Sequence, residues 1–244
     1  EGARGAAEEV EEVLLTAAID EQLLNIIDDA LVAGDEIRQV VLVGPGMDTR
    51  PYRLPWPAQT ALFSVGIPAV LQAEEEALAQ VGAKPPKGCV LRRVPAGINS
   101  GAGEEWTEKL ANVGYRGDKK SVWALVGCCG LSTAQIGSVV MECSLSMAAG
   151  TVLVGELPLR PDLDPVKLLA GYELLGTVGN PWDLPAAVGR AAAAGLGRTP
   201  ADGPGRVLIR AVQRRRSEAE DDLFNMHARA IEEAGDEDYY DNIT

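Results

Sequence analysis

Gln39-Val40-Val41-Leu42-Val43-Gly44-Pro45-Gly46-Met47-Asp48-Thr49-Arg50 is an apolar run that leads directly into a glycine turn. Four consecutive apolar residues, most of them β-branched, predict a buried strand. The two glycines of the turn allow a ligand to approach the bare backbone closely. In open α/β sheets, ligands bind outside the carboxyl ends of the strands. The run therefore predicts a crevice for a nucleotide-like cofactor.

Apolar runs and helical patterns alternate along the rest of the chain. Further strands are expected at 61–65, 89–94, 121–126, 151–154 and 207–212, and helices at 68–82, 104–113, 132–148 and 184–195. Such alternation predicts an α/β fold with a mostly parallel sheet covered by helices on both faces. A short strand near Arg198–Ala201, paired with the final strand, is expected to form an antiparallel edge.

We expect three segments in the chain: 1–34, 35–216 and 217–244. The first should form two helices, over 1–16 and 19–34, that pack on the core. The last is acidic but carries a helical stripe of apolar residues, with Phe224 beside it and Tyr239-Tyr240 after it: Leu223, Met226, Ala230 and Ile231. Two readings of this tail stay open: a helix packed on its own domain, and a docking segment that orders on a partner protein.

Composition and charge exclude several classes of function. The 244 residues carry a net charge of -14, so the chain should repel nucleic acids and anionic lipid surfaces. No apolar run approaches the ~20 residues that span a membrane. No signal or transit peptide is seen, and a chain that begins at Glu1 and not at Met suits a processed or trimmed product. Four cysteines lie in apolar runs and His227 is the single histidine, so we expect reduced thiols, a reducing compartment (cytosol or organelle stroma or matrix), and neither disulfides nor a metal site.

Three motifs together resemble the leucine carboxyl methyltransferase family. They are Ile27-Asp28-Asp29, then the run from Gln39 to Arg50, then Tyr52-Arg53-Leu54-Pro55-Trp56. Weaker similarity continues through Phe63–Pro68, Val122–Leu131 and Gly150–Pro158, so that the resemblance covers about residues 20–215. It implies the seven-stranded, Rossmann-like methyltransferase sheet and S-adenosylmethionine as the cofactor.

The resemblance also indicates which positions would hold that cofactor. A carboxylate is best held by a forked guanidinium, and a ribose diol by an acidic side chain. The family's arginine falls on Asn25, its acidic residue after the second strand on Ser64 or Gly66, its Asp-Leu pair on Gly97-Ile98, and its glutamate after the fourth strand on Val126. The residual turn, Gly44, Gly46 and Asp48, is kept while the polar ligands are replaced.

The segment that covers the substrate in the family is also short here, with only Leu157–Tyr172 in its place. We therefore expect a catalytically degenerate methyltransferase-like protein that acts as a structural or interaction subunit of a larger assembly, with no catalytic residue and no cofactor. The alternative is an active O- or carboxyl-methyltransferase with an altered pocket. A third reading has Ile98, Val126 and Cys128 lining a crevice for another, apolar ligand.

Several reactive-looking side chains have a simpler structural reading. Asp48 can cap the helix start, and Arg50 and Arg53 can tie the loop down. Cys128-Cys129 lacks a nearby base in the sequence and is expected to pack. The expected partners are other proteins, through 217–244, and a processed start with an acidic surface would suit a chloroplast complex.

Overall fold

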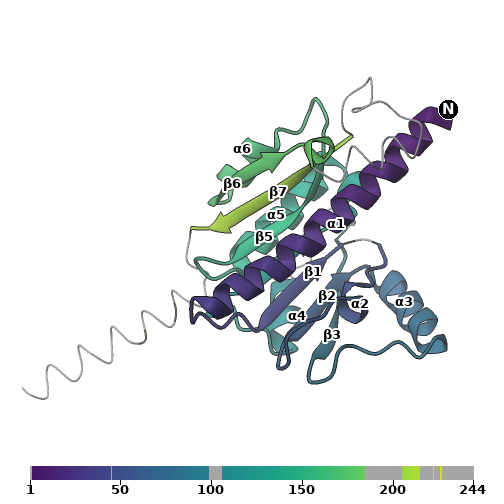
Figure 1. The fold of residues 1–244 in the computed structure, drawn as a ribbon. Coiled ribbons are helices and arrows are strands. Elements are labelled where there is room, and N and C mark those ends of the chain that lie inside the picture. The colour runs from purple at the N-terminus through teal and green to yellow at the C-terminus, as the bar shows by residue number, and fades with distance from the viewer. Residues whose placement is uncertain are drawn as a thin grey trace, which may run out of the picture.

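The computed structural model describes residues 2–44, 46–98, 106–184 and 205–214, together with Asp222 and Met226. Seven strands in the order β3-β2-β1-β4-β5-β7-β6 form one sheet (Figure 1). β3, β2, β1, β4 and β5 pair in parallel, and β7 is antiparallel to both of its neighbours, β5 and β6. Their bounds are β1 Gln39–Val43, β2 Ala61–Gly66, β3 Val90–Pro95, β4 Val122–Leu125, β5 Val152–Pro158, β6 Leu174–Gly179 and β7 Arg206–Gln213.

The central strands are buried on both faces, as their unbroken apolar runs predict. Every residue of β1 and β4 is buried, and Val41 of β1 lies between Phe63 of β2 and Trp123 of β4. Strands that face helices on both sides need apolar residues at every position. The expected mostly parallel α/β sheet with an antiparallel strand pairing at one side is confirmed.

Helices cover both faces of the sheet. α1 (Gly2–Val32) crosses one face and contacts β4, β5 and β7 (Figure 1). The other face is covered by α4 (Trp106–Asn112), α5 (Thr133–Ser146) and α6 (Pro165–Gly171), whose buried side chains form the larger of the two main cores. Short α2 (Arg50–Arg53) follows β1, and α3 (Pro68–Gln80) follows β2. The carboxyl ends of the parallel strands lie together at one edge of the sheet, between the helices that cover its two faces.

The amino-terminal segment is one helix, so the expected division into two helices at 1–16 and 19–34 is wrong. α1 continues through Ala17 and Ala18 without a break. The apolar positions on both sides of this point, including Leu15, Ala18, Ile19 and Leu23, pack into a single core with β1, β2 and β4. Alanine is the best helix former, so nothing in the sequence forces a stop there.

The sheet edge beside β7 is also formed differently from the expectation. Both neighbours of β7 are assigned, to β5 and β6, so the antiparallel edge consists of Leu174–Gly179 and not of a strand near Arg198–Ala201. Residues 198–201, the expected helix at 184–195 beyond Leu184, and the tail 217–244 apart from Asp222 and Met226 lie outside the described residues. Two 3-10 turns, η1 (Cys128–Gly130) and η2 (Pro181–Asp183), complete the described elements.

Candidate functional site

A cleft of about 320 Å³ lies where β1, β4 and β5 end, beside α1. This is the edge at which parallel sheets bind ligands. The cleft is lined from four segments: Glu12, Thr16 and Ile19 of α1; Gly46, Met47, Asp48, Thr49, Arg50 and Arg53 after β1; Val126 and Gly127 after β4; and Glu156 of β5. The glycine turn is thus part of the cleft, as predicted.

The two glycines of the turn have different surroundings. A Cβ on Gly44 would lie 2.7 Å from the carbonyl oxygen of Val126, so this glycine lets the ends of β1 and β4 meet. A Cβ on Gly46 would meet nothing within 4 Å. Gly44 therefore serves packing, whereas Gly46 faces the open part of the cleft.

The arginines after the turn bind acidic side chains on both sides of the cleft. Arg50 Nε donates to Asp20 Oδ1 at 2.7 Å and its Nη1 donates to Asp48 Oδ2 at 3.1 Å. Arg53 Nη1 donates to the other oxygen of Asp20. Burial lowers the pKa of Arg50, but Asp48 and Asp20 outweigh it and raise the pKa above its ordinary value. Asp48 also accepts the backbone N–H of Arg50, but the N-cap of α2 is Thr49, so Asp48 ties the loop down together with Arg50 and Arg53 and is not itself the helix cap.

A second cluster of charges closes the β5 side of the cleft. The Glu156 carboxylate accepts the Gly127 N–H at 2.8 Å and the Arg206 Nη1–H at 3.0 Å. Arg206 also bonds Glu12, and its backbone N–H donates to Glu11 of α1. Burial raises the pKa of Glu156, and Arg206 partly opposes this rise. The first helix and the last strand are therefore held together by paired charges.

The structure brings only some of the predicted positions to the cleft. Gly46, Asp48 and Val126 line it, and Gly44 lies directly behind the turn. Asn25 is exposed on α1 and Ser64 is buried within β2, so neither belongs to the cleft lining. A Cβ on Gly66 would lie 3.0 Å from the Gly44 carbonyl oxygen and 3.3 Å from Leu71, so the end of β2 is closely packed. The positions of an acidic ribose ligand and of the arginine are thus outside the cleft.

The expected apolar crevice lined by Ile98, Val126 and Cys128 is not formed. Ile98 and Cys128 are buried in the core on the α5 side of the sheet, whereas Val126 packs toward the α1 side. Gly97, which precedes Ile98, is outside the lining of the cleft. Gly127, between Val126 and Cys128, has a left-handed backbone (φ 69°), and Cys128 begins η1, so the chain turns there and places the two side chains on different sides of the sheet.

Sequence reasoning missed several acidic side chains around the site. Glu12 and Glu156 line the cleft, and Asp20 pairs with its arginines. Glu74 of α3 is 1% exposed; one of its oxygens accepts the Asp48 N–H at 3.0 Å and the other, Oε1, has no partner among the described atoms. Burial raises the pKa of Glu74. Glu74 stands in a run of three glutamates. The signal in the sequence that could have marked it as the buried one is its position three residues after buried Leu71, on the same face of the helix.

The thiols near the cleft are poor nucleophiles. Burial and the Glu156 carboxylate raise the pKa of Cys128 to about 12 and that of Cys129 to about 11.

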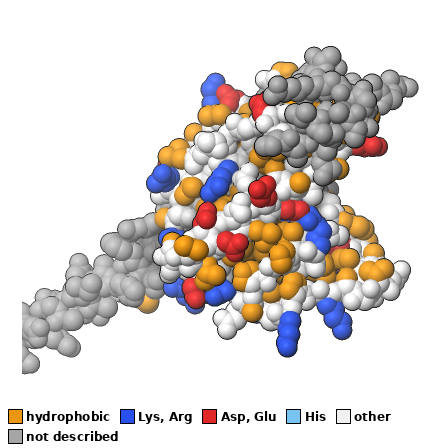
Figure 2. All heavy atoms as spheres, viewed as in Figure 1, with side chains coloured by type: hydrophobic (Ala, Val, Ile, Leu, Met, Phe, Trp, Pro, Cys, Tyr) orange, Lys and Arg blue, Asp and Glu red, His pale blue; other side chains and the backbone are white. Residues whose placement is uncertain are grey.

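Within the described part of the chain, the structure shows no group of three side chains able to hold a metal ion. Among the same residues, no helix is long and apolar enough to cross a bilayer. On the face drawn in Figure 2, acidic and basic side chains are interspersed over the described residues and form no extended basic patch.

The strand order, the antiparallel β7 and the glycine turn at the end of β1 define a Rossmann-like methyltransferase fold. Solved structures agree: a DUF574 family protein from Streptomyces avermitilis has a TM-score of 0.55 at 13% identity, covering 84% of this chain and 83% of that one. A structure from Thermobifida fusca titled "putative methyltransferase" has a TM-score of 0.50 at 15% identity, covering 88% and 84%.

The chain belongs to the leucine carboxyl methyltransferase family, whose sequence model matches residues 11–139. "O-methyltransferase 1, chloroplastic" from Oryza sativa subsp. japonica is 28% identical over 94% of this chain and 64% of its own length. A "Putative S-adenosyl-L-methionine-dependent methyltransferase" from Mycolicibacterium paratuberculosis is 34% identical over 56% of this chain and 42% of its own length. The chain therefore spans less than two thirds of the length of these relatives.

Proposed function

We propose that this chain is a methyltransferase-fold protein that does not use S-adenosylmethionine in the ordinary way and acts as a structural or interaction subunit of a larger assembly. The observation that supports this proposal is the pairing of the charges around the cleft. Arg50 and Arg53 bond Asp20, and Glu156 bonds Arg206. These side chains are committed to holding α1, the turn and β7 together.

The cofactor would need charged groups that can turn toward it. Its carboxylate would have to compete with Asp20 for a guanidinium. Ser64 or Gly66 stands where the family has the acid that binds the ribose diol. Each missing charged hydrogen bond weakens binding by ~1.5–3 kcal/mol. Two or three such losses would move a micromolar dissociation constant beyond the millimolar range. The described residues therefore do not fit the cofactor, and no reaction step is assigned to it.

Calorimetric titration with S-adenosylmethionine and with S-adenosylhomocysteine tests this proposal. We expect dissociation constants weaker than ~1 mM for both. Micromolar binding of either compound would overturn the proposal, provided that Gly46→Val, which fills the open part of the cleft, removes it. Gly130→Val is the matched control, because a Cβ there also meets nothing within 4 Å and Gly130 does not line the cleft.

A place in an organelle is the second part of the proposal. The rice relative is named chloroplastic, and free cysteines at Cys89, Cys128, Cys129 and Cys143 suit a reducing compartment such as the stroma. Fluorescence microscopy of the tagged full-length protein in plant cells tests the compartment. Native size analysis of the same material tests the assembly: a species at the mass of a single chain would contradict a subunit role.

An active O- or carboxyl-methyltransferase with an altered pocket is the second candidate. The open space beside Gly46, within a cleft of about 320 Å³, supports it. It predicts transfer of a labelled methyl group from S-adenosylmethionine to an acceptor, abolished by Gly46→Val and kept by Gly130→Val. Absence of transfer to carboxylate and hydroxyl acceptors by the folded chain would remove this candidate.

A further inference from the structure

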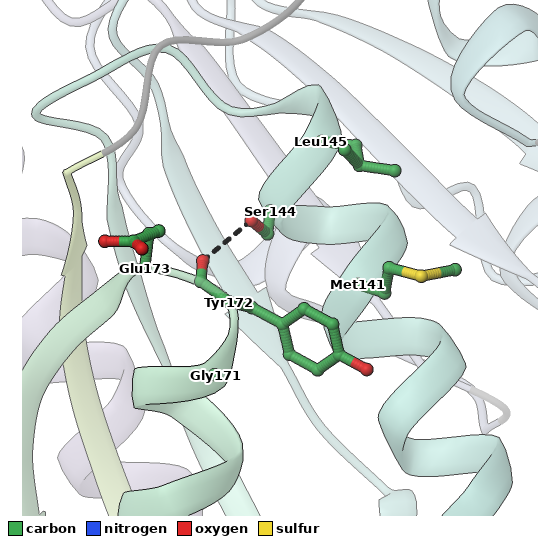
Figure 3. A pocket seen from close by; sticks show the side chains of 6 residues that line it. All are labelled: Met141, Ser144, Leu145, Gly171, Tyr172 and Glu173. Carbon is green, nitrogen blue, oxygen red and sulfur yellow. Dashed lines mark hydrogen bonds between the residues drawn. The ribbon is translucent and has the colours of Figure 1, made fainter.

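A second hollow, of about 620 Å³, lies between α5 and the turn that joins α6 to β6 (Figure 3). We call it the α5 groove; it is lined by Met141, Ser144, Leu145, Gly171, Tyr172 and Glu173. Helix α5 ends there shortly before β5 begins, and β7 ends there beside the start of β5. The groove is therefore at the amino-terminal edge of the parallel strands, opposite the cleft beside the glycine turn.

The α5 wall of the groove is apolar, the hydrogen-bonding groups of its floor are paired, and Glu173 is the charged side chain of its lining. Met141 and Leu145 are one helical turn apart and are 36% and 41% exposed, and the Tyr172 ring lies on the same side (Figure 3). Glu142, the one charged residue of α5, is buried and accepts a hydrogen bond from Thr107. On the floor, Ser144 Oγ donates to the Tyr172 carbonyl oxygen at 2.8 Å. Such a surface favours an apolar helix face over a polar ligand.

The chain leaves the sheet at the rim of this groove. The Arg214 backbone N–H donates to the Glu173 carbonyl oxygen at 3.0 Å, directly after β7 ends. The sequence beyond it carries the apolar stripe Leu223, Met226, Ala230 and Ile231, at helical spacing, on an otherwise acidic segment. Met226, the member of the stripe that the structure describes, is 59% exposed, so its side chain has apolar surface left to bury.

We infer that the segment 217–231 docks on the α5 groove of its own chain as an amphipathic helix, with Leu223 and Met226 against Met141 and Leu145. Only residues 215 and 216 separate Arg214 from this segment, so the helix would begin within about 10 Å of the groove rim at Arg214. The acidic side chains of the segment would remain in water and point away from Glu173, the charged residue of the groove lining. The inference does not depend on the proposed loss of cofactor use.

Hydrogen–deuterium exchange on the full chain tests this docking in both directions. Met226→Asp should raise exchange of the amides in 137–147 and 171–175 by roughly tenfold, because the groove loses its cover. Leu145→Asp, on the surface of α5, should raise exchange of the amides in 217–231 to a similar extent. Val81→Asp is the control, since Val81 is 77% exposed at the far end of α3 and should change neither region.

The outcome of each variant is decisive for the inference. Unchanged exchange in the groove on Met226→Asp, with the chain folded by circular dichroism, would overturn it. Protection that increases with protein concentration would also overturn it, because the segment would then occupy the groove of a second copy. Concentration-independent protection that both variants remove is the expected result.

Discussion

The Nε atom of Arg50 lies 2.7 Å from Asp20 Oδ1, and this contact joins the loop after β1 to the middle of α1 across thirty residues of sequence. Asp20 is 14% exposed and Arg50 7% in their side chains, so the pair is largely shielded from water. The same carboxylate also binds Arg53. One side chain thus fixes the position of α1 over the turn that defines the cleft.

Asp20→Asn should destabilise the fold by about 3 kcal/mol, because it leaves the buried Arg50 guanidinium with Asp48 as its remaining anion. Urea unfolding at neutral pH measures the change. Asp35→Asn is the control: its pair with Lys120 is nearly half exposed on both sides and should cost less than about 1 kcal/mol. Equal losses in both variants would contradict the assigned role of Asp20.

Alanine substitutions at the two glycines of the turn should have different effects on stability. Gly44→Ala should cost about 1–3 kcal/mol, because the added Cβ would approach the Val126 carbonyl oxygen to 2.7 Å. Gly46→Ala should change the unfolding free energy by less than about 0.5 kcal/mol, since nothing lies within 4 Å of its Cβ. Thermal unfolding of the two variants side by side checks the difference, and a stable Gly44→Ala would refute the close contact.

Buried Glu74 should make the protein less stable as pH rises. Its folded pKa is raised above the ordinary value of 4.5, chiefly by burial. A raised carboxyl pKa stabilises the fold below pH 4.5, and that contribution is lost as pH rises through the folded pKa. Glu74→Gln should therefore flatten the fall in unfolding free energy above pH 4.5.

The pH test needs a control on the same helix. Glu76→Gln, an exposed neighbour of Glu74, should keep the wild-type pH profile. Glu156 contributes in the same direction as Glu74, because burial also raises its pKa. The slope in Glu74→Gln should thus be reduced and not abolished; a slope identical to wild type would show that Glu74 does not titrate as described.

Cys129 should react slowly with alkylating reagents although it is exposed. Partial desolvation and Glu156 raise its pKa to about 11 from an ordinary value of 9.0. The thiolate is the reactive form, so alkylation at pH 7.5 should be roughly a hundredfold slower than for a free thiol with an ordinary pKa. Mass spectrometry of iodoacetamide labelling over time measures this rate. Rapid labelling at neutral pH would indicate an activated nucleophile.

Much of the fold could be predicted from local pattern. All six strands expected from apolar runs are present, because buried parallel strands are apolar throughout. β6 was missed since Leu174–Gly179 contains two glycines and is mostly exposed, as an edge strand can be. Residues 155–158 of β5 were missed because a glycine and a proline, Gly155 and Pro158, are typical of a turn. Gly155 is instead required by close strand packing: a Cβ there would lie 2.2 Å from the Leu125 carbonyl oxygen.

The candidate site was less predictable because its contacts are distant in sequence. The glycine turn and Val126 were placed correctly at the cleft, since each follows a strand directly. Asn25 was matched to the family's arginine by its place in the motif. On the uninterrupted helix α1, however, its side chain lies on the exposed face. Sequence patterns did not identify three acidic residues of the site, Glu12, Asp20 and Glu156, because their roles depend on how α1 crosses the sheet. A charged residue on a helix is expected to face solvent until its partner is known.

The strand order has a consequence for synthesis on the ribosome. β7 lies between β5 and β6, although both are translated before it. Glu11, near the start of the chain, binds the backbone N–H groups of Gly205 and Arg206, 194 and 195 positions later. A nascent chain that has not yet released residue 213 therefore leaves one edge of β5 unpaired and α1 without its contacts to β7. Folding of this sheet is completed only after translation has passed its last strand, and until then the open edge calls for chaperone protection.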